Sequence, residues 1–332
     1  MTVLAPGVRT LPVRSWRAGV STAFAVTLGQ PSLWLLGALG FAGRGGFLLL
    51  ALPIVTVPSP VVLSIIFRGS FATTGLSSEL ESLLILLVGV LFVGGLLLSA
   101  YADVAAFERL VRDPESDELR AGMVPHDLEP GERRRLVLAL AGIQAVALVP
   151  ALIVVSGLYE GMTALVTQEL SAPGSLEIPL VLRVLAGARD QLLVLALLIL
   201  VADAISALAS RGVLAWHFRV ATADAPRASS ALWAAMGGAE RLVARPLRTA
   251  ANLALTWAIT LLVLAPIVWA SLVAWDGVRA LFLSPAGLTE PMDLALAILA
   301  SVGLAAIWVA GSILAGSASA LRAAVWSADA LR

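Results

Sequence analysis

Five charge-poor stretches, each about as long as a bilayer is thick, constrain most strongly what this chain can fold into. A transmembrane helix needs about 20 mostly apolar residues to cross about 30 Å of hydrocarbon. The five stretches are residues 83–107, 136–158, 191–210, 249–275 and 294–321. Over the whole chain 59% of the residues are apolar, 13% are charged, and the mean hydropathy is +0.95. The sequence therefore predicts an all-α integral membrane protein rather than a soluble domain.

The N-terminal apolar region carries one formal charge, Arg44, and allows two interpretations. In the first, residues 13–30 form an amphipathic helix on the membrane surface and residues 32–57 form one span. In the second, residues 18–43 and 45–67 are separate spans joined by a turn at Arg44. The first interpretation gives six transmembrane helices in total, and the second gives seven.

The arginine distribution favours six spans, because basic residues concentrate on the cytoplasmic flanks of transmembrane helices. With six spans, 17 of the 22 arginines lie on one side, four lie on the other, and Arg44 lies within the membrane. Seven spans would leave 15 against 7. We therefore predict three hairpins with both termini cytoplasmic. The lysine-free, alanine- and leucine-rich composition, without a cleavable signal sequence, favours a bacterial inner membrane.

Two interfacial amphipathic helices are predicted, at residues 13–30 and 226–245. Each has apolar residues at every third or fourth position on one face; these are Trp16, Val20, Phe24 and Leu28 in the first, and Leu232, Met236, Ala239 and Val243 in the second. A proline follows each of them, at Pro31 and Pro246, and proline is well tolerated in the first turn of the next helix. Each helix is either a connector at the interface or a docking element.

The residue inventory excludes several chemistries. All 22 basic residues are arginine and cysteine is absent, so Schiff bases, P-loop lysines, disulfides and thiolate metal sites are excluded. The two histidines, His126 and His217, lack metal-ligand spacing, and we predict no catalytic residue, metal or cofactor. The net charge of zero gives no electrostatic case for nucleic acid binding.

The expected partners are membrane lipids and other membrane or cytosolic proteins. The mixed-charge loop after the second span is either a solvated linker or a docking site for such a protein.

Three charged residues form a candidate intramembrane network: Arg44, Asp103 and Asp203. A central arginine costs about 2.5–3.5 kcal/mol to insert into a membrane, so each buried charge requires a partner. Arg44 lies near the middle of residues 32–57, among glycines that could interrupt a helix. We predict that it pairs with Asp103 or Asp203, either structurally or as part of a discontinuous helix that binds an ion or substrate. A local interaction near the interface is the alternative for both carboxylates.

Small residues in the last span are spaced for close helix packing. Gly311 and Ala315, and likewise Ser312 and Gly316, lie four residues apart. This pattern allows helices to approach closely, either within the bundle or between protomers.

The layout as a whole resembles poorly characterised bacterial multi-pass proteins related to the membrane domain of glycerophosphodiester phosphodiesterases. Three features carry the resemblance: the stretch from Trp16 to Pro31, its counterpart from Trp233 to Pro246, and the small-residue ends of the even-numbered spans. The resemblance implies a membrane layout. It implies no phosphodiesterase activity and supplies no site residue.

Two functional classes follow from these features. The first is a non-enzymatic accessory or scaffold subunit, or a modulator of the lipid environment. The alternative is a small secondary transporter or permease component with Arg44, Asp103 and Asp203 in the translocation route. A packed, dry interior favours the first class, and a water-filled cavity that reaches Arg44 favours the second.

Overall fold

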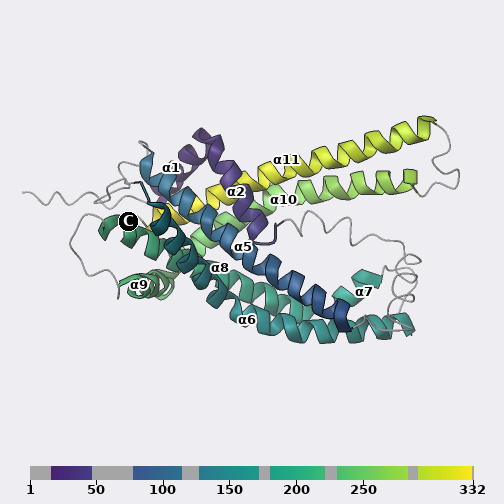
Figure 1. Ribbon diagram of the computed structural model, residues 1–332, viewed down its shortest axis with the longest axis horizontal. Coiled ribbons are helices and arrows are strands. Elements are labelled where there is room, and N and C mark those ends of the chain that lie inside the picture. The colour runs from purple at the N-terminus through teal and green to yellow at the C-terminus, as the bar shows by residue number, and fades with distance from the viewer. Residues whose placement is uncertain are drawn as a thin grey trace, which may run out of the picture.

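The computed structural model describes residues 16–46, 78–113, 127–171, 180–220, 230–282 and 291–330, and the structural statements below concern these residues. Their regular structure is entirely α-helical, as predicted. In chain order the helices are α1 (Trp16–Gly29), α2 (Pro31–Gly43), α5 (Ser78–Arg112), α6 (Pro130–Ser171), α7 (Leu180–Gly187), α8 (Arg189–Val220), α9 (Ser230–Ala244), α10 (Pro246–Phe282) and α11 (Pro291–Ala330) (Figure 1).

Five helices, α5, α6, α8, α10 and α11, are long and apolar enough to cross a membrane, and each contains one of the five predicted stretches. Helices α1 and α2 pass the same test only as a pair bent by 99°. The five helices contain 32 to 42 residues. At 1.5 Å per residue they are about 48–63 Å long, longer than the hydrocarbon thickness of about 30 Å. A bilayer would therefore cover only part of each helix.

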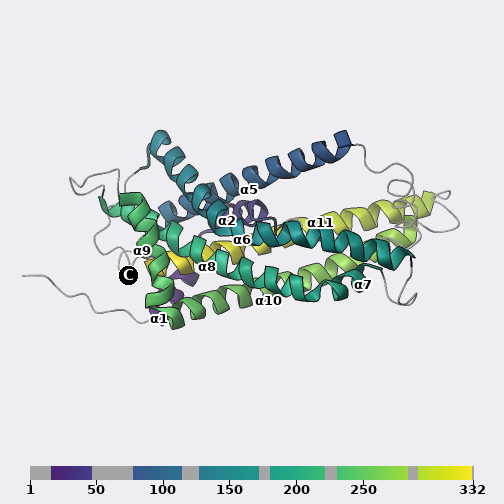
Figure 2. The same cartoon turned by 90° about the horizontal axis from the view of Figure 1, so that it is seen from below.

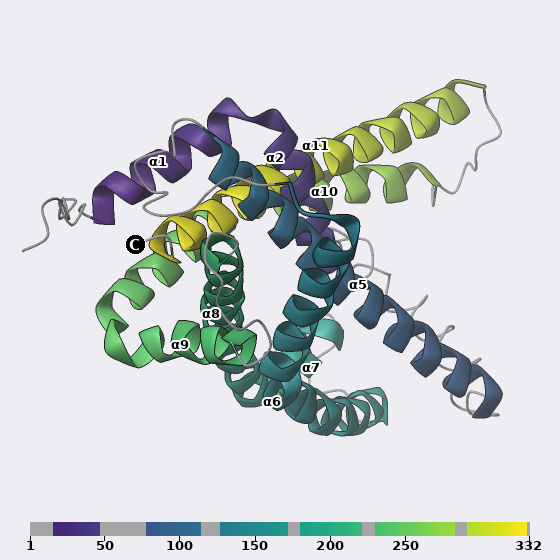
Figure 3. The ribbon, with the colours of Figure 1, turned by 60° about the vertical axis from the view of Figure 1, so that its left-hand side comes forward.

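Large apolar side chains cover the surface at one end of the bundle, the splayed end, which holds the first halves of α5 and α11. Residues 86–91 of α5 are exposed on every helical face, and Val146, Leu193, Leu262 and Leu299 are between 68% and 76% exposed. The α10–α11 hairpin diverges from α5 at this end (Figures 1 and 3). Apolar patches this large are unfavourable in water and are compatible with a lipid environment.

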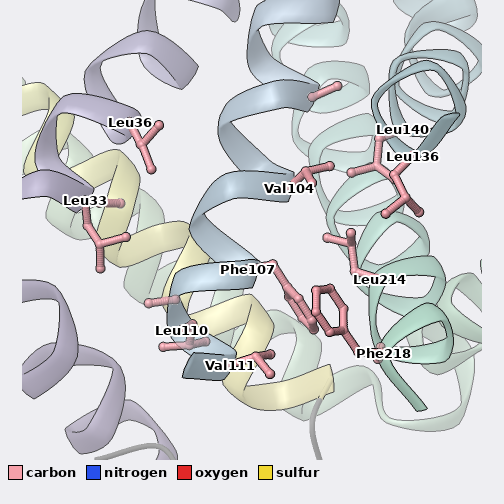
Figure 4. Packing of buried hydrophobic residues seen from close by; sticks show 14 of the residues in the cluster. Leu33, Leu36, Val104, Phe107, Leu110, Val111, Leu136, Leu140, Leu214 and Phe218 are labelled. Atoms are coloured by element: carbon pink, nitrogen blue, oxygen red, sulfur yellow. The ribbon is translucent and has the colours of Figure 1, made fainter. Parts of the chain in front are cut away.

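The opposite, packed end holds the main apolar core. It consists of residues 104–111 of α5, 136–141 of α6, 213–218 of α8 and 320–328 of α11, with α1 and α2 against them. The Phe107 and Phe218 rings lie in this core with their centroids 5.5 Å apart and their planes tilted by 43° (Figure 4). Helix α2 packs against α5 and α11, α6 against α8, and α10 against α11.

The last turns of α11 form the centre of this packed end. The helix continues nine residues beyond the end of the predicted span, to Ala330, and nearly every residue from 318 onward is buried. Figure 3 shows this part of α11 between α1 and α2 on one side and α8 and α9 on the other. Because Ala, Ser and Gly dominate it, the surrounding backbones can approach α11 closely.

Trp326 is the largest fully buried side chain, 1% exposed against Ala207 and Leu208 of α8. Replacing Trp326 with alanine is expected to lower the free energy of unfolding by about 3–5 kcal/mol, because a large cavity remains in the packed end. Thermal unfolding in detergent, followed by circular dichroism, measures this loss. Trp269→Ala is the matched control, since Trp269 is 68% exposed on α10; equal melting temperatures for the two variants would contradict the packing described here.

Helices α1 and α9 occupy the two predicted interfacial stretches and precede helices that begin at Pro31 and Pro246. Helix α9 runs across the long axis followed by α8 and α10 (Figure 2). It packs on α8, and its Leu232, Trp233 and Val243 side chains are 68–81% exposed. Of the four residues predicted to form its apolar face, Leu232, Met236 and Val243 are exposed and Ala239 is half-buried.

Helix α1 packs differently from the expectation. Its buried face is Gly19, Ala23, Val26 and Thr27, which contacts α11. Of the residues predicted to form its apolar face, Trp16, Val20 and Phe24 are half-buried and Leu28 is 64% exposed. The face with the smaller residues packs against α11 because it allows the two helices to approach more closely.

The bend between α1 and α2 is held by the side chains of Trp34 in α2 and of Gln30 between the two helices. The Trp34 indole N–H donates to the Thr27 carbonyl oxygen at 2.7 Å, and the Gln30 amide donates to Asp113 at the end of α5. Helix α2 then ends at Gly43, earlier than the predicted span of residues 32–57, and Gly45 has a positive φ of 81°. Residues 47–57 of that prediction lie outside the described residues. Arg44 therefore follows a helix C-terminus instead of lying within a continuous helix.

Candidate functional site: a buried charge network

Asp103 of α5 is the centre of a network contributed by four parts of the chain. The Arg211 guanidinium of α8 donates to Asp103 Oδ1 at 2.8 Å, and the Gln144 amide of α6 donates to Oδ2 at 3.3 Å. Arg44 Nη1 lies 3.9 Å from the same Oδ1. Asp103 and Arg211 side chains are 7% and 3% exposed, so this ion pair is removed from water. Breaking such a pair leaves an uncompensated buried charge.

Asp203 of α8 forms a second centre. It pairs with Arg322 of α11, and the Trp257 indole N–H of α10 donates to its Oδ2 at 3.3 Å. The side chains of Arg322 and Asp203 are 12% and 14% exposed. The two centres thus join α5, α6, α8, α10 and α11.

Arg44 lies between these helices, and its nearest carboxylate is that of Asp103, at 3.9 Å. Its Nη2 donates to Ser319 Oγ of α11 at 2.6 Å and lies 3.4 Å from the position of a Cβ on Gly40, one turn earlier in α2. The arginine thus folds back along its own helix, and Gly40 leaves the space for it. The side chain is 28% exposed. Of its two predicted partners, the structure brings Asp103 near Arg44, while Asp203 pairs with Arg322.

Sequence reasoning missed Arg211, Arg322 and Gln144 as network members. Arg211 and Arg322 are among the 17 arginines that six spans place on one side of the membrane, because hydropathy does not reveal that α8 and α11 continue beyond them. Gln144 carried a detectable signal: it is a long polar side chain in the middle of the apolar stretch 136–158.

Further ion pairs link helices at both ends of the bundle. Glu108 accepts from Arg112 at 2.5 Å and from Arg133 at 2.7 Å, and so links α5 to the start of α6. Arg248 and Asp329 form an ion pair of 2.7 Å between α10 and the end of α11. At the splayed end, Arg183 of α7 pairs with Glu169 of α6 at 2.6 Å.

The chemistry available at the network is charge neutralisation and anion recognition. In the described part of the chain, no group of three or more His, Cys, Asp and Glu side chains could hold a metal ion. Asp103 and Asp203 are each engaged by an arginine and a second hydrogen-bond donor. Carboxylates saturated in this way are poorly placed to act as proton acceptors or cation ligands.

No protein family, curated protein or solved structure matches this chain. The resemblance in layout to the membrane domain of glycerophosphodiester phosphodiesterases therefore stays a prediction.

Proposed function

We propose that this chain is a non-enzymatic integral membrane protein that serves as an accessory or scaffold subunit. The observation that carries the proposal is the filled centre of the bundle. The last turns of α11 occupy the position that a translocation route would need, and Arg211 and Arg322 are each paired with an aspartate. Such a bundle is suited to hold a fixed shape in the membrane.

The proposed setting is a bacterial inner membrane with both termini in the cytoplasm. The packed end carries most of the arginines of the described helices, which is the side that the positive-inside rule assigns to the cytoplasm. In this orientation α9 lies at the cytoplasmic interface, with its exposed Leu232, Trp233 and Val243 toward lipid. Its partners would be membrane lipids and neighbouring membrane or cytosolic proteins.

A small secondary transporter or permease component is the second candidate. Two observations favour it: helix α2 is interrupted at Gly43, and the Arg44 side chain is 28% exposed. Discontinuous helices with a charged residue at the break bind ions and substrates in transporters. The two candidates differ in whether water reaches the centre of the bundle.

Single-cysteine labelling in native membrane vesicles separates these functions, because the chain has no cysteine of its own. We expect Ala207→Cys and Ser210→Cys, both buried on α8 between the two network centres, to remain unlabelled by a small water-soluble thiosulfonate. Ser171→Cys and Glu240→Cys are the exposed controls, and should be labelled from opposite sides of the membrane. Labelling at both buried positions as fast as at the controls would favour transport and contradict the scaffold proposal.

A further inference from the structure

Positive charge exceeds negative charge around Arg44. The described charged groups whose fields reach this guanidinium are Arg211, Arg322, Asp103 and Asp203. Together with Arg44 they comprise three cations and two anions. A buried cluster with one uncompensated charge is costly in a region of low dielectric constant, so a further anion would be stabilising there.

The two carboxylates cannot supply that anion, because each already has closer partners. Asp103 is 2.8 Å from Arg211 but 3.9 Å from Arg44, and Asp203 is paired with Arg322. Among the described residues, the side chain of Arg44 makes one hydrogen bond, to the neutral Ser319 hydroxyl. A guanidinium has five N–H donors in a planar fork that matches phosphate and carboxylate geometry. Among the described residues, hydrogen bonds therefore use one of the five N–H donors of Arg44.

Ser99 provides a second, independent observation. Its hydroxyl is fully buried and has no hydrogen-bond partner among the described residues. Ser99 lies one helical turn before Asp103 on α5, so the two side chains share a face. Its backbone nitrogen is 2.8 Å from where a Cβ of Gly43 would lie, which places Ser99 beside the residue that precedes Arg44. An unsatisfied buried hydroxyl at this point is a ready donor for an anion.

The depth of the cluster matches that of a lipid headgroup. Tyr101, two residues before Asp103, is 40% exposed, and tyrosine is enriched where lipid tails meet headgroups. The exposed apolar side chains of α11 extend as far as Leu314, one turn before Ser319. Arg44 thus lies at the boundary between the apolar band and the packed end.

From this placement we infer that Arg44, supported by Ser99, binds a phosphate group, as carried by the headgroup of an anionic phospholipid or by free inorganic phosphate. The fork of Arg44 donates to two phosphate oxygens, and the Ser99 hydroxyl donates to a third. Arg211 and Arg322 stabilise the phosphate electrostatically while they remain paired with Asp103 and Asp203. The inference rests on the membrane insertion proposed above and is independent of the scaffold role.

The test measures phosphate-group binding to the full chain by native mass spectrometry from detergent. Wild type, Arg44→Gln, Ser99→Ala and the control Arg189→Gln are each titrated with phosphatidylglycerol, with phosphatidylcholine and with inorganic phosphate. We expect Arg44→Gln to weaken phosphatidylglycerol binding by about tenfold or more, as loss of a charge-assisted hydrogen-bonded contact implies. Arg189, which is 79% exposed at the splayed end, should be replaceable without effect.

Ser99→Ala keeps the test valid if Arg44→Gln fails to fold. The Ser99 hydroxyl makes no hydrogen bond within the described protein, so its removal should leave the melting temperature unchanged while it weakens phosphate-group binding. Competition by inorganic phosphate would identify a free-anion site, and its absence would identify a lipid site. Equal phosphatidylglycerol binding by wild type and Ser99→Ala, together with equal binding by any folded Arg44→Gln protein, would overturn the inference. Membrane insertion is tested separately, by the resistance of the chain to alkaline extraction from vesicles, so that a failure of insertion can be distinguished from a failure of phosphate-group binding.

Discussion

Replacing Asp103 with alanine is expected to destabilise the protein by about 3–5 kcal/mol, because the substitution leaves the buried Arg211 charge without its carboxylate. The Arg211 side chain is 3% exposed and cannot turn to water without opening the contact between α5 and α8. Gln144 loses its hydrogen-bond acceptor, and Arg44 loses its nearest carboxylate, at the same time. Thermal unfolding of the purified protein in detergent, followed by circular dichroism, measures the effect.

Two variants show whether the loss comes from the unpaired charge. Asp190→Ala removes a carboxylate that is 84% exposed beside Arg189, and exposed pairs of this kind contribute little, so no measurable change is expected. Asp103→Ala combined with Arg211→Leu removes both buried charges and should be more stable than Asp103→Ala alone. A double variant as unstable as the sum of the two single variants would show that the pair is not energetically coupled.

The sequence predicted part of the network because the cost of burying a charge depends on the apolar stretch around it. Charges are rare within apolar stretches, so Arg44, Asp103 and Asp203 were identifiable without a fold. The ion-pair partner of each charged residue could not be predicted in this way, because the partners lie far apart in the sequence. Which arginine reaches Asp103 depends on the packing of α8 against α5 and α6, and Arg211 is 108 residues away in the chain.

The same limit applies to the helices. Apolar length predicted five membrane-crossing candidates, because hydropathy averages over a whole span. It did not predict that α11 continues to Ala330 as a buried central helix, since a stretch of Ala and Ser has the same composition on the surface and in a core. Nor did it locate the end of α2 at Gly43, which depends on the contacts of that glycine with Gly95 and Ser99.

Replacing Gly37 with alanine is expected to cost about 3 kcal/mol or more, at the upper end of the range for overpacked cores. A Cβ on Gly37 would overlap the carbonyl oxygen of Gly316 and lie 2.7 Å from the Ala320 nitrogen. These are backbone atoms, so α2 and α11 would have to separate. Because α11 is the central helix, separation would also loosen the contact between Arg44 and Ser319. The melting temperature and the yield of folded protein in membranes report this loss.

The controls are glycines in equally regular helices where a Cβ meets nothing within 4 Å. Gly94→Ala on α5 should be neutral or slightly stabilising, since alanine favours a helix over glycine by about 0.5–1 kcal/mol. Adjacent glycines on α9 repeat the contrast. Gly238→Ala would overlap the Leu208 carbonyl oxygen of α8 and should detach α9, whereas Gly237→Ala should not. If Gly37 and Gly238 tolerate alanine as well as Gly94 and Gly237 do, α2 and α11, and likewise α8 and α9, are not packed closely enough to require a glycine. The central place of α11, on which the scaffold proposal depends, would then be lost.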